Sequence, residues 1–377
     1  MTDSKAAPKA GLEGVAVADS AIGKIDGSVG ELRYCGYLIK DLAEQSDFVE
    51  TSALLWDGEL PNESELESLR NEMKAARALT PLQLDLVRRL AGEQQPMDCL
   101  RTVVSACATG NDVLTADPVI NRERSIDLTA KLPTIVAAYD RVRKGLPVVE
   151  PRDDLDHASN FLYMLTGSVP DAHEARMFDT CLVLHAEHGF NASTFSARVT
   201  AATLSDIYSA ITSAIGTLRG PLHGGANTAV MNMLLDIGSV DAVESYVDAL
   251  LQRGEKIMGF GHRVYKVVDP RALILKQFAS ELAQSKGEPK WFEMSQAIEN
   301  LIKARKGLDM NVDFYSASTY HYMGIDADLF TCVFAMSRVA GWTAHVLEQY
   351  SNNRLIRPRS NWVGPDARDY VPLGSRR

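Results

Sequence analysis

Apolar residues recur every three or four positions over most of the chain, which is the spacing of one face of an α-helix. The clearest stripe of leucines and isoleucines covers Leu204–Leu218. Gly220-Pro221 ends this predicted helix, because proline lacks the backbone amide that a helix needs. A second apolar stripe predicts a long buried helix over Leu329–Gln349, with Arg338 in its middle.

Capping residues mark where several of these helices begin. Asn62 and Thr80 each stand three residues before a Glu or Gln, so each pair can satisfy free amides of a first helical turn. Val169–Asp171 opens another predicted helix, whose apolar stripe extends to His188. Because Gly189 follows, we expect His188 at a helix end that a ligand could reach.

One segment near the N-terminus departs from the helical pattern. Ala21–Ile25 and Glu31–Tyr34 are separated by a stretch that begins with Asp26-Gly27, a favoured tight turn. This arrangement predicts a small β-hairpin. The sequence therefore predicts an all-α fold with one small N-terminal β-hairpin.

Composition excludes some function classes and points to one local feature. The 377 residues suffice for a large core, and 46% hydrophobic with 23% charged residues is ordinary for a globular protein. A formal net charge of −10 argues against a nucleic-acid partner. Residues 253–306 nevertheless carry eleven Lys/Arg against six Asp/Glu, which suggests a local anion site or a solvated helical surface.

The cysteines and the terminus indicate a cellular location. The five cysteines are scattered and form no CxxC pair, which is typical of reduced thiols in the cytosol. Residues 1–9 lack the apolar core of a signal peptide. Arg338 and His345 interrupt the most apolar late stretch, so we expect a buried helix there and not a membrane span. We therefore expect a cytoplasmic protein with no membrane partner.

Three predicted bends between helices carry groups suited to acid–base chemistry. His223 and His262 each lie among glycines, and Asp313 lies in the irregular stretch Met310–Ala317. None belongs to a helical stripe, so none is needed to fill a core. A capping turn with a satisfied side chain is the alternative for each bend, and one bend alone does not decide between them.

Three arginines suggest a substrate with more than one carboxylate. Arg338 interrupts an apolar helix, and Arg357 precedes a proline in an extended basic tail. Arg271 follows the second glycine-rich bend. Guanidinium groups bind carboxylates as two-pronged forks, although each arginine could instead pair with an acid of the protein.

Other catalytic classes find little support. The chain has no GxSxG elbow, no Walker loop and no HExxH motif. His185 with His188, and His345 with Glu348, have a spacing that could hold a metal, but neither pair has a third ligand nearby. The remaining chemistry is metal-free removal of a proton next to a carbonyl, with donors for the developing oxyanion.

The chain resembles the citrate synthase family over nearly its whole length, from Gly11–Val15 to Tyr370–Leu373. The ordered motifs that carry the resemblance are His185–Phe195, Gly220–Asn227, Gly259–Arg271, Asn311–Ala317 and Arg357-Pro358. It implies an almost wholly helical homodimer with a large domain at 1–222 and 324–377 and a small domain at 223–323. The active cleft would lie between the two domains.

The resemblance also implies the reaction and its catalytic residues. Asp313 would take a proton from the methyl group of acetyl-CoA while His223 donates a hydrogen bond to the thioester oxygen. His262 would polarise and protonate the ketone of oxaloacetate, and water would then hydrolyse the citryl thioester. An aspartate is too weak a base to form a free carbanion, so the donor is essential.

Substrate contacts follow from the same resemblance. Oxaloacetate would be held by His188, Arg271 and Arg338, with Arg357 reaching in from the partner subunit. The coenzyme A loop would comprise Lys256, Ile257, Met258, Gly259 and Phe260. The coenzyme A thioester is a co-substrate, and the resemblance implies no permanently bound cofactor and no metal.

Three rival functions remain open. A 2-methylcitrate synthase would use propionyl-CoA through the same residues, although His185 and Val312 look more like the citrate type. A non-catalytic sensor of coenzyme A or carboxylates could dispense with Asp313. A metal-dependent hydrolase would lose activity with a chelator. The chain lacks the N-terminal extension of larger NADH-inhibited members, so we expect no NADH regulation.

Overall fold

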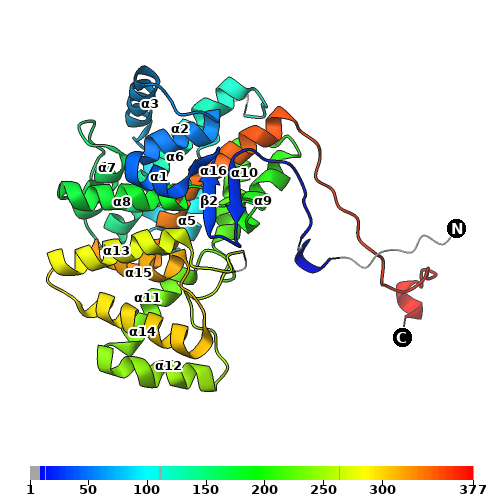
Figure 1. The fold of residues 1–377 in the computed structure, drawn as a ribbon. Coiled ribbons are helices and arrows are strands. Elements are labelled where there is room, and N and C mark those ends of the chain that lie inside the picture. The colour runs from blue at the N-terminus through cyan, green and yellow to red at the C-terminus, as the bar shows by residue number, and fades with distance from the viewer. Residues whose placement is uncertain (1–8, 13, 110–112, 263, 377) are drawn as a thin grey trace.

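The computed structural model describes residues 9–12, 14–109, 113–262 and 264–376, and most of them are helical (Figure 1). The strands are β1 (Gly23–Asp26), β2 (Glu31–Tyr34) and β3 (Tyr37–Leu38). The α-helices are α1 (Ile39–Gln45), α2 (Phe48–Asp57), α3 (Glu63–Ala76), α4 (Pro81–Leu90), α5 (Pro96–Ser105), α6 (Pro118–Arg143), α7 (His157–Thr166), α8 (Ala172–His185), α9 (Ala192–Ala201), α10 (Ile207–Leu218), α11 (Ala226–Ile237), α12 (Val243–Gln252), α13 (Pro270–Ser285), α14 (Lys290–Lys306), α15 (Val312–Tyr322) and α16 (Phe330–Ser351). Short 3-10 helices are η1 (Ala10–Leu12), η2 (Val240–Ala242), η3 (Ala327–Leu329) and η4 (Leu373–Ser375).

The predicted hairpin is confirmed, and it gains a third strand that the sequence did not reveal. β1 and β2 pair antiparallel with Asp26 opposite Glu31, and β3 continues the sheet beside β2. The β2–β3 turn places Cys35 and Gly36 at φ 46° and 94°. Two positive φ values define the tight turn that suits a two-residue hairpin, and cysteine is not a residue that predicts it.

The predicted helix starts are confirmed by capping hydrogen bonds. Asn62 and Thr80 each accept the backbone N–H three residues later, and the Glu or Gln there bonds back to the cap. Asp171 caps α8 directly after Pro170. The helix predicted from the stripe at Leu204–Leu218 begins about one turn too early, because Asp206 caps α10 and the helix starts at Ile207. Leu204 lies outside the helix and is 52% exposed.

α16 is the central helix of the larger group of helices. It packs against α2, α6, α8, α9 and α10, and it is buried along nearly its whole length. In Figure 1, α11–α15 lie together below this group, where α15 packs against both α11 and α13. We propose that these two groups are the large and small domains, divided at 222/223 and 323/324.

The segment after α16 leaves the helical body. Residues 352–376 are largely extended and exposed apart from the short η4, and Figure 1 shows them running away from the helices. No helix within the described ranges has the length and apolar character needed to cross a bilayer.

Candidate active site

Two of the predicted histidines meet beside an unpredicted tyrosine. The rings of His188 and His262 have centroids 5.4 Å apart, and Tyr265 lies 5.7 Å and 4.7 Å from them. Tyr265 also bonds its hydroxyl to His188 Nε2 at 3.3 Å. His188 follows the end of α8 by three residues, so its side chain is free of the helix, as expected. Burial and the positive charge of Arg271 hold the pKa of His188 well below its usual value.

A buried ion pair fixes the start of α13 beside these rings. Arg271 is 2% exposed and binds Asp269 through Nε at 3.0 Å and through Nη2 at 2.7 Å. The alternative for this arginine, a pair with an acid of the protein, is therefore present. Because Nε and Nη2 hold Asp269, Nη1 is the donor that a substrate carboxylate could use. Asp269 Oδ2 also accepts the Val312 N–H at 3.2 Å, which ties the start of α13 to the start of α15.

Asp313 lies in the first turn of helix α15, so the prediction of an irregular bend there was wrong. Asn311 caps this helix and accepts the Asp313 N–H at 3.0 Å. The Asn-Val-Asp sequence marks a helix start, which the irregular composition of Met310–Ala317 concealed. Burial raises the pKa of Asp313 to about 6, while the charge of Arg271 opposes the rise. The group is therefore ionised at neutral pH but is a stronger base than an ordinary aspartate.

His262 offers a single N–H to the cleft. Its Nδ1 accepts the backbone N–H groups of Val264 at 3.0 Å and of Tyr265 at 3.1 Å. A nitrogen that accepts two amide protons carries none itself, so the proton of the neutral ring is on Nε2. Burial and the charge of Arg271 lower the pKa of His262 to about 4, so the ring is neutral at pH 7.

His223 has the opposite tautomer. It lies in the turn between α10 and α11, and its Nε2 accepts the Ser193 N–H at 3.2 Å and lies 2.8 Å from the Ser193 hydroxyl. The proton of the neutral ring is therefore on Nδ1. Burial and the charge of Arg338 lower the pKa of His223 to about 4.

Arg338 is a buried cation without an acidic partner. It is 1% exposed, donates from Nε to the His185 carbonyl oxygen at 2.6 Å, and lies over the Phe334 ring at 4.7 Å. Within the described ranges no carboxylate oxygen lies at ion-pair distance from it. Burial lowers the pKa of Arg338 to about 10, so it stays charged at neutral pH. A buried unpaired guanidinium is costly, which favours a ligand carboxylate as its partner.

The five residues predicted to contact coenzyme A line one cavity. Lys256–Phe260 borders a space of about 550 Å³ together with Lys306, near the start of α15. Gly259 has φ +84°, and a Cβ there would lie 2.7 Å from Phe314 Cδ2. The Asn311 N–H bonds to the Gly259 carbonyl at 2.9 Å, so this loop is joined to the segment that precedes Asp313.

Arg357 is not brought to this cleft by its own chain. It is exposed on the segment that leaves the helical body. The possible metal pairs also have structural roles. His185 bonds to the Cys181 carbonyl at 2.8 Å, and His345 lies between Arg198 at 3.1 Å and Glu187 at 3.2 Å. The described residues contain no group of three or more His, Cys, Asp or Glu side chains placed to hold a metal.

Sequence reasoning missed three residues that shape the site. Ser193 and Tyr265 orient histidines, and Asp269 holds Arg271. Asp269 carried a usable signal, because an Asp before Pro at a helix start is a cap that can also reach the following arginine. Ser193 and Tyr265 each contact one histidine through a backbone N–H group, for which residue type gives no signal, and each also has its hydroxyl within hydrogen-bond distance of a histidine ring.

The chain is similar to known proteins over nearly its whole length. The sequence matches the family described as "Citrate synthase, C-terminal domain" over residues 11–359. It is 52% identical to a citrate synthase of Haloferax volcanii, over 98% of this chain and 99% of that protein. A 2-methylcitrate synthase of Shewanella oneidensis is 41% identical, over the whole of both chains. The crystal structure of citrate synthase from Pyrobaculum aerophilum superimposes with a TM-score of 0.91 at 43% identity, over 97% of this chain and 95% of that one. The chain belongs to the citrate synthase family.

Proposed function

We propose that this chain is a citrate synthase, which condenses acetyl-CoA with oxaloacetate and water to give citrate and coenzyme A. The observation that carries the proposal is that two buried arginines link the three groups, near a cavity lined by Lys256–Phe260 and Asn311. The charges of Arg271 and Arg338 both act on Asp313, that of Arg338 acts on His223, and that of Arg271 acts on His262. Asp313 adjoins the Arg271–Asp269 pair through Val312, and the rings of His188 and His262 meet edge to face with centroids 5.4 Å apart. A sensor would need neither a base of raised pKa nor two histidines of fixed tautomer.

Asp313 takes a proton from the methyl group of the thioester. The carboxylate is a far weaker base than the carbanion, so the negative charge must be stabilised on the thioester oxygen as it forms. His223 supplies that donor through Nδ1–H, because Nε2 is engaged by the Ser193 N–H. Its pKa of about 4 keeps the ring neutral, so it donates a hydrogen bond without already being a cation.

The carbon of this hydrogen-bonded enolate then attacks the ketone carbon of oxaloacetate. As the new carbon–carbon bond forms, the ketone π electrons move to oxygen, which accepts the proton from His262 Nε2. Nδ1 is held as an acceptor by two backbone amides, so this donor is aligned before the substrate binds. Water then attacks the citryl thioester carbonyl and returns a proton to His262 Nε2. Coenzyme A leaves as the thiol, with the proton that Asp313 took from the methyl group, so both side chains regain their starting states.

Oxaloacetate carries two carboxylates, and the cleft offers matching donors. Arg338 has no acidic partner within the described ranges, and Arg271 retains Nη1 beyond its pair with Asp269. His188 adds one further polar contact, with its ring oriented by the Tyr265 hydroxyl. We assign Arg357 of a second copy to the same substrate, since the segment that carries it leaves its own helical body. This assignment makes the working unit a homodimer.

The cavity beside Lys256–Phe260 suits the coenzyme A part of the thioester. Lys256 and Lys306 supply positive charge for its phosphates, and the apolar wall suits the less polar end. The acid–base steps assigned to Asp313, His223 and His262 balance without a metal, so we propose metal-independent catalysis and no permanently bound cofactor. The five free cysteines, four of them buried, support our proposal of a cytoplasmic enzyme.

The function is tested by thiol release and product identification. We expect oxaloacetate-dependent release of coenzyme A from acetyl-CoA, citrate as the product, and full activity in excess chelator. Absence of thiol release with every short acyl-CoA would leave only the sensor. Chelator-dependent loss would favour a metal hydrolase.

The acyl preference is decided by kcat/KM for acetyl-CoA against propionyl-CoA at saturating oxaloacetate. His185 lies buried against Phe334, and Val312 is buried next to Asp313. Val312 therefore adjoins the proposed base, and His185 contacts the ring over which Arg338 lies, so we expect both side chains to favour the shorter acyl group. A strong preference for propionyl-CoA would make the chain a 2-methylcitrate synthase.

A further inference from the structure

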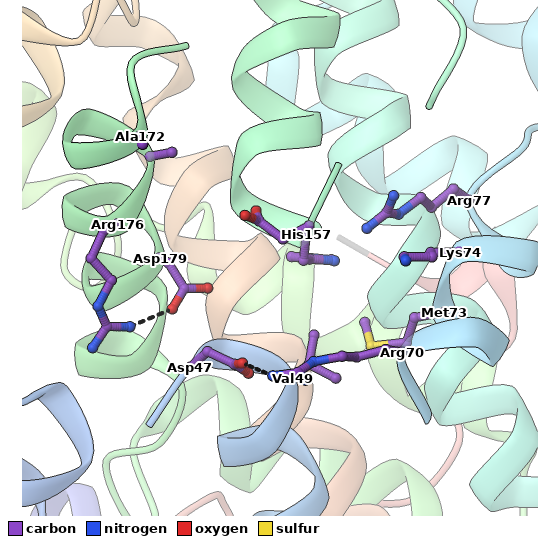
Figure 2. Close-up of a pocket in the computed structure, with 12 residues that line it drawn as sticks. Asp47, Val49, Arg70, Met73, Lys74, Arg77, His157, Ala172, Arg176 and Asp179 are labelled. Carbon is purple, nitrogen blue, oxygen red and sulfur yellow. Dashed lines mark hydrogen bonds and ion pairs between the residues drawn. The ribbon is translucent and has the colours of Figure 1, made fainter. Parts of the chain in front are cut away.

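A second enclosed site lies at the opposite end of α8 from His188. A cavity of about 240 Å³ is enclosed by the start of α2, the last turns of α3, the start of α7 and the first half of α8 (Figure 2). Because α8 has 14 residues, its two ends are about 20 Å apart. The cavity is therefore separate from the catalytic cleft. Its charged lining residues are Arg70, Lys74, Arg77, Arg176, Asp47, Asp156 and Asp179.

The three carboxylates of this cavity already have donors from the protein. Asp47 pairs with Arg70 at 2.5 Å, and Asp179 pairs with Arg176 at 3.1 Å. Asp156 caps α7 and uses both carboxylate oxygens for the first turn of that helix. Two of the four cations are therefore neutralised, and none of the acids needs a further partner.

Three other side chains of the same cavity, His157, Arg77 and Lys74, have no carboxylate partner within the described residues. His157 and Arg77 are each 3% exposed, and within the described residues neither His157 Nε2 nor Arg77 Nε has a hydrogen-bond partner. Lys74 has no carboxylate at ion-pair distance among those residues. Figure 2 shows the three side chains pointing toward the same space. Arg77 Nη1 donates to the carbonyl oxygens of Arg152 and Leu155, each at 2.9 Å, and Lys74 is partly exposed, so the buried nitrogens without a partner are Arg77 Nε and His157 Nε2. Buried polar groups are nearly always satisfied, so these two nitrogens beside the Lys74 ammonium indicate a ligand that accepts hydrogen bonds.

We propose that this cavity binds a small anion through a carboxylate or phosphate group held by Lys74, Arg77 and His157. Burial and the charge of Arg77 lower the pKa of His157 to about 3, so the ring is neutral and contributes an N–H donor without charge. Val49, Met73 and Ala175 form an apolar wall that suits a short aliphatic body. The volume lies below the range of cavities that hold drug-sized ligands, so the ligand is a small metabolite and not a dinucleotide.

A methyl resonance inside the cavity can report binding directly. Met73 is 1% exposed and lines the cavity, so its ¹³C-methyl signal in the intact enzyme, assigned with Met73→Leu, reports occupancy locally. The signal is followed during separate titrations with inorganic phosphate and with propionate, which distinguish the two acceptor chemistries. We expect at least one of them to give a saturable shift with a midpoint of about 1 mM or lower.

Two matched variants test whether Lys74 holds the anion. Lys74 is partly exposed, so Lys74→Gln removes the charge without opening the core. Lys40→Gln is the control, because Lys40 lies on α1 outside the cavity. We expect the midpoint to rise about tenfold or more in Lys74→Gln and to stay unchanged in Lys40→Gln. No saturable shift with either anion, or an equal midpoint in Lys74→Gln and the wild type, would overturn the proposal.

Discussion

At the scale of single residues, backbone amides decide which N–H each of the two histidines that we propose as catalytic can donate. His262 turns Nε2–H to the cleft because two amides occupy Nδ1, and His223 turns Nδ1–H to it because Ser193 occupies Nε2. Both rings have a pKa of about 4 and remain neutral over the working pH range. Asp313 is therefore the group of this triad whose protonation changes nearest to neutral pH.

The first prediction concerns this titration. Burial raises the pKa of Asp313 to about 6, so the carboxyl is protonated below that pH and can no longer act as a base. We expect kcat/KM for acetyl-CoA to be flat above about pH 7 and to fall about tenfold per pH unit below about pH 6. The profile is measured at saturating oxaloacetate. A profile that stays flat down to about pH 4.5 would contradict the assignment of Asp313 as the base.

At the scale of elements, the sequence predicted those helices and turns whose determinants are local. Asn62 and Thr80 predicted the starts of α3 and α4, because their side chains cap the first turns of these helices. The third strand was missed because Cys35 adopts a positive φ that only its place in the sheet explains. Leu204 was wrongly assigned to a helix, because the Asp206 cap starts α10 after it despite the apolar stripe. The candidate site could be predicted only through the family resemblance, because contacts among α8, α13 and α15 bring together residues that are far apart in sequence.

The second prediction concerns the loop that lines the coenzyme A cavity. Gly259→Ala would put a methyl group 2.7 Å from Phe314 Cδ2 on a backbone at φ +84°, so the loop must move. We expect KM for acetyl-CoA to rise about tenfold, with a smaller change in kcat. Gly287→Ala is the control, because φ is +65° there and no atom lies within 4 Å of the added carbon. Equal KM values for both variants would show that Gly259 does not shape the cavity.

The third prediction concerns the packing of α16 on the segment before His188. A Cβ at Gly341 would lie 2.6 Å from Glu187 Oε2 and closer still to the Ala186 carbonyl oxygen. Gly→Ala inside a helix normally stabilises by about 1 kcal/mol, but overpacking against backbone costs about 1–3 kcal/mol. We expect Gly341→Ala to lower the thermal unfolding midpoint at fixed protein concentration.

Gly216→Ala in α10 is the matched control for this packing. Its added carbon would meet only Arg101 Cδ at 3.6 Å, which is an ordinary contact. We expect the midpoint of Gly216→Ala to stay equal or to rise, since only the helix preference changes. A rise of the same size in Gly341→Ala would contradict the close approach of α16 to Ala186 and Glu187.

At the scale of the whole molecule, Arg357 stands apart from the other residues that we assign to the cleft. Residues 352–376 leave the helical body and carry Arg357 away with them, while the remaining assigned residues lie on one chain's helices and loops (Figure 1). We therefore assign the role of Arg357 to the cleft of another copy. We therefore expect the active site to be shared between the two subunits of a dimer.

The fourth prediction tests this sharing by mixing two inactive variants. In a mixed dimer of Asp313→Ala and Arg357→Ala subunits, one of the two sites would combine an intact Asp313 with an intact Arg357 from the other chain. Random pairing makes about half of all dimers mixed, so about a quarter of the wild-type rate should return. Coexpressed subunits are compared with each variant alone. No recovery would show that Arg357 acts within its own chain, and normal activity of Arg357→Ala alone would show that it does not act in catalysis.

The central claim is that Asp313 is the base of a condensation in a preformed oxaloacetate site, and Asp313→Ala tests it most directly. The measurement pairs the rate of coenzyme A release from acetyl-CoA with calorimetric binding of oxaloacetate to the same sample. We expect the rate to fall by about 10³-fold or more, while oxaloacetate affinity changes by less than about tenfold. Near-normal thiol release by the folded variant would contradict the account.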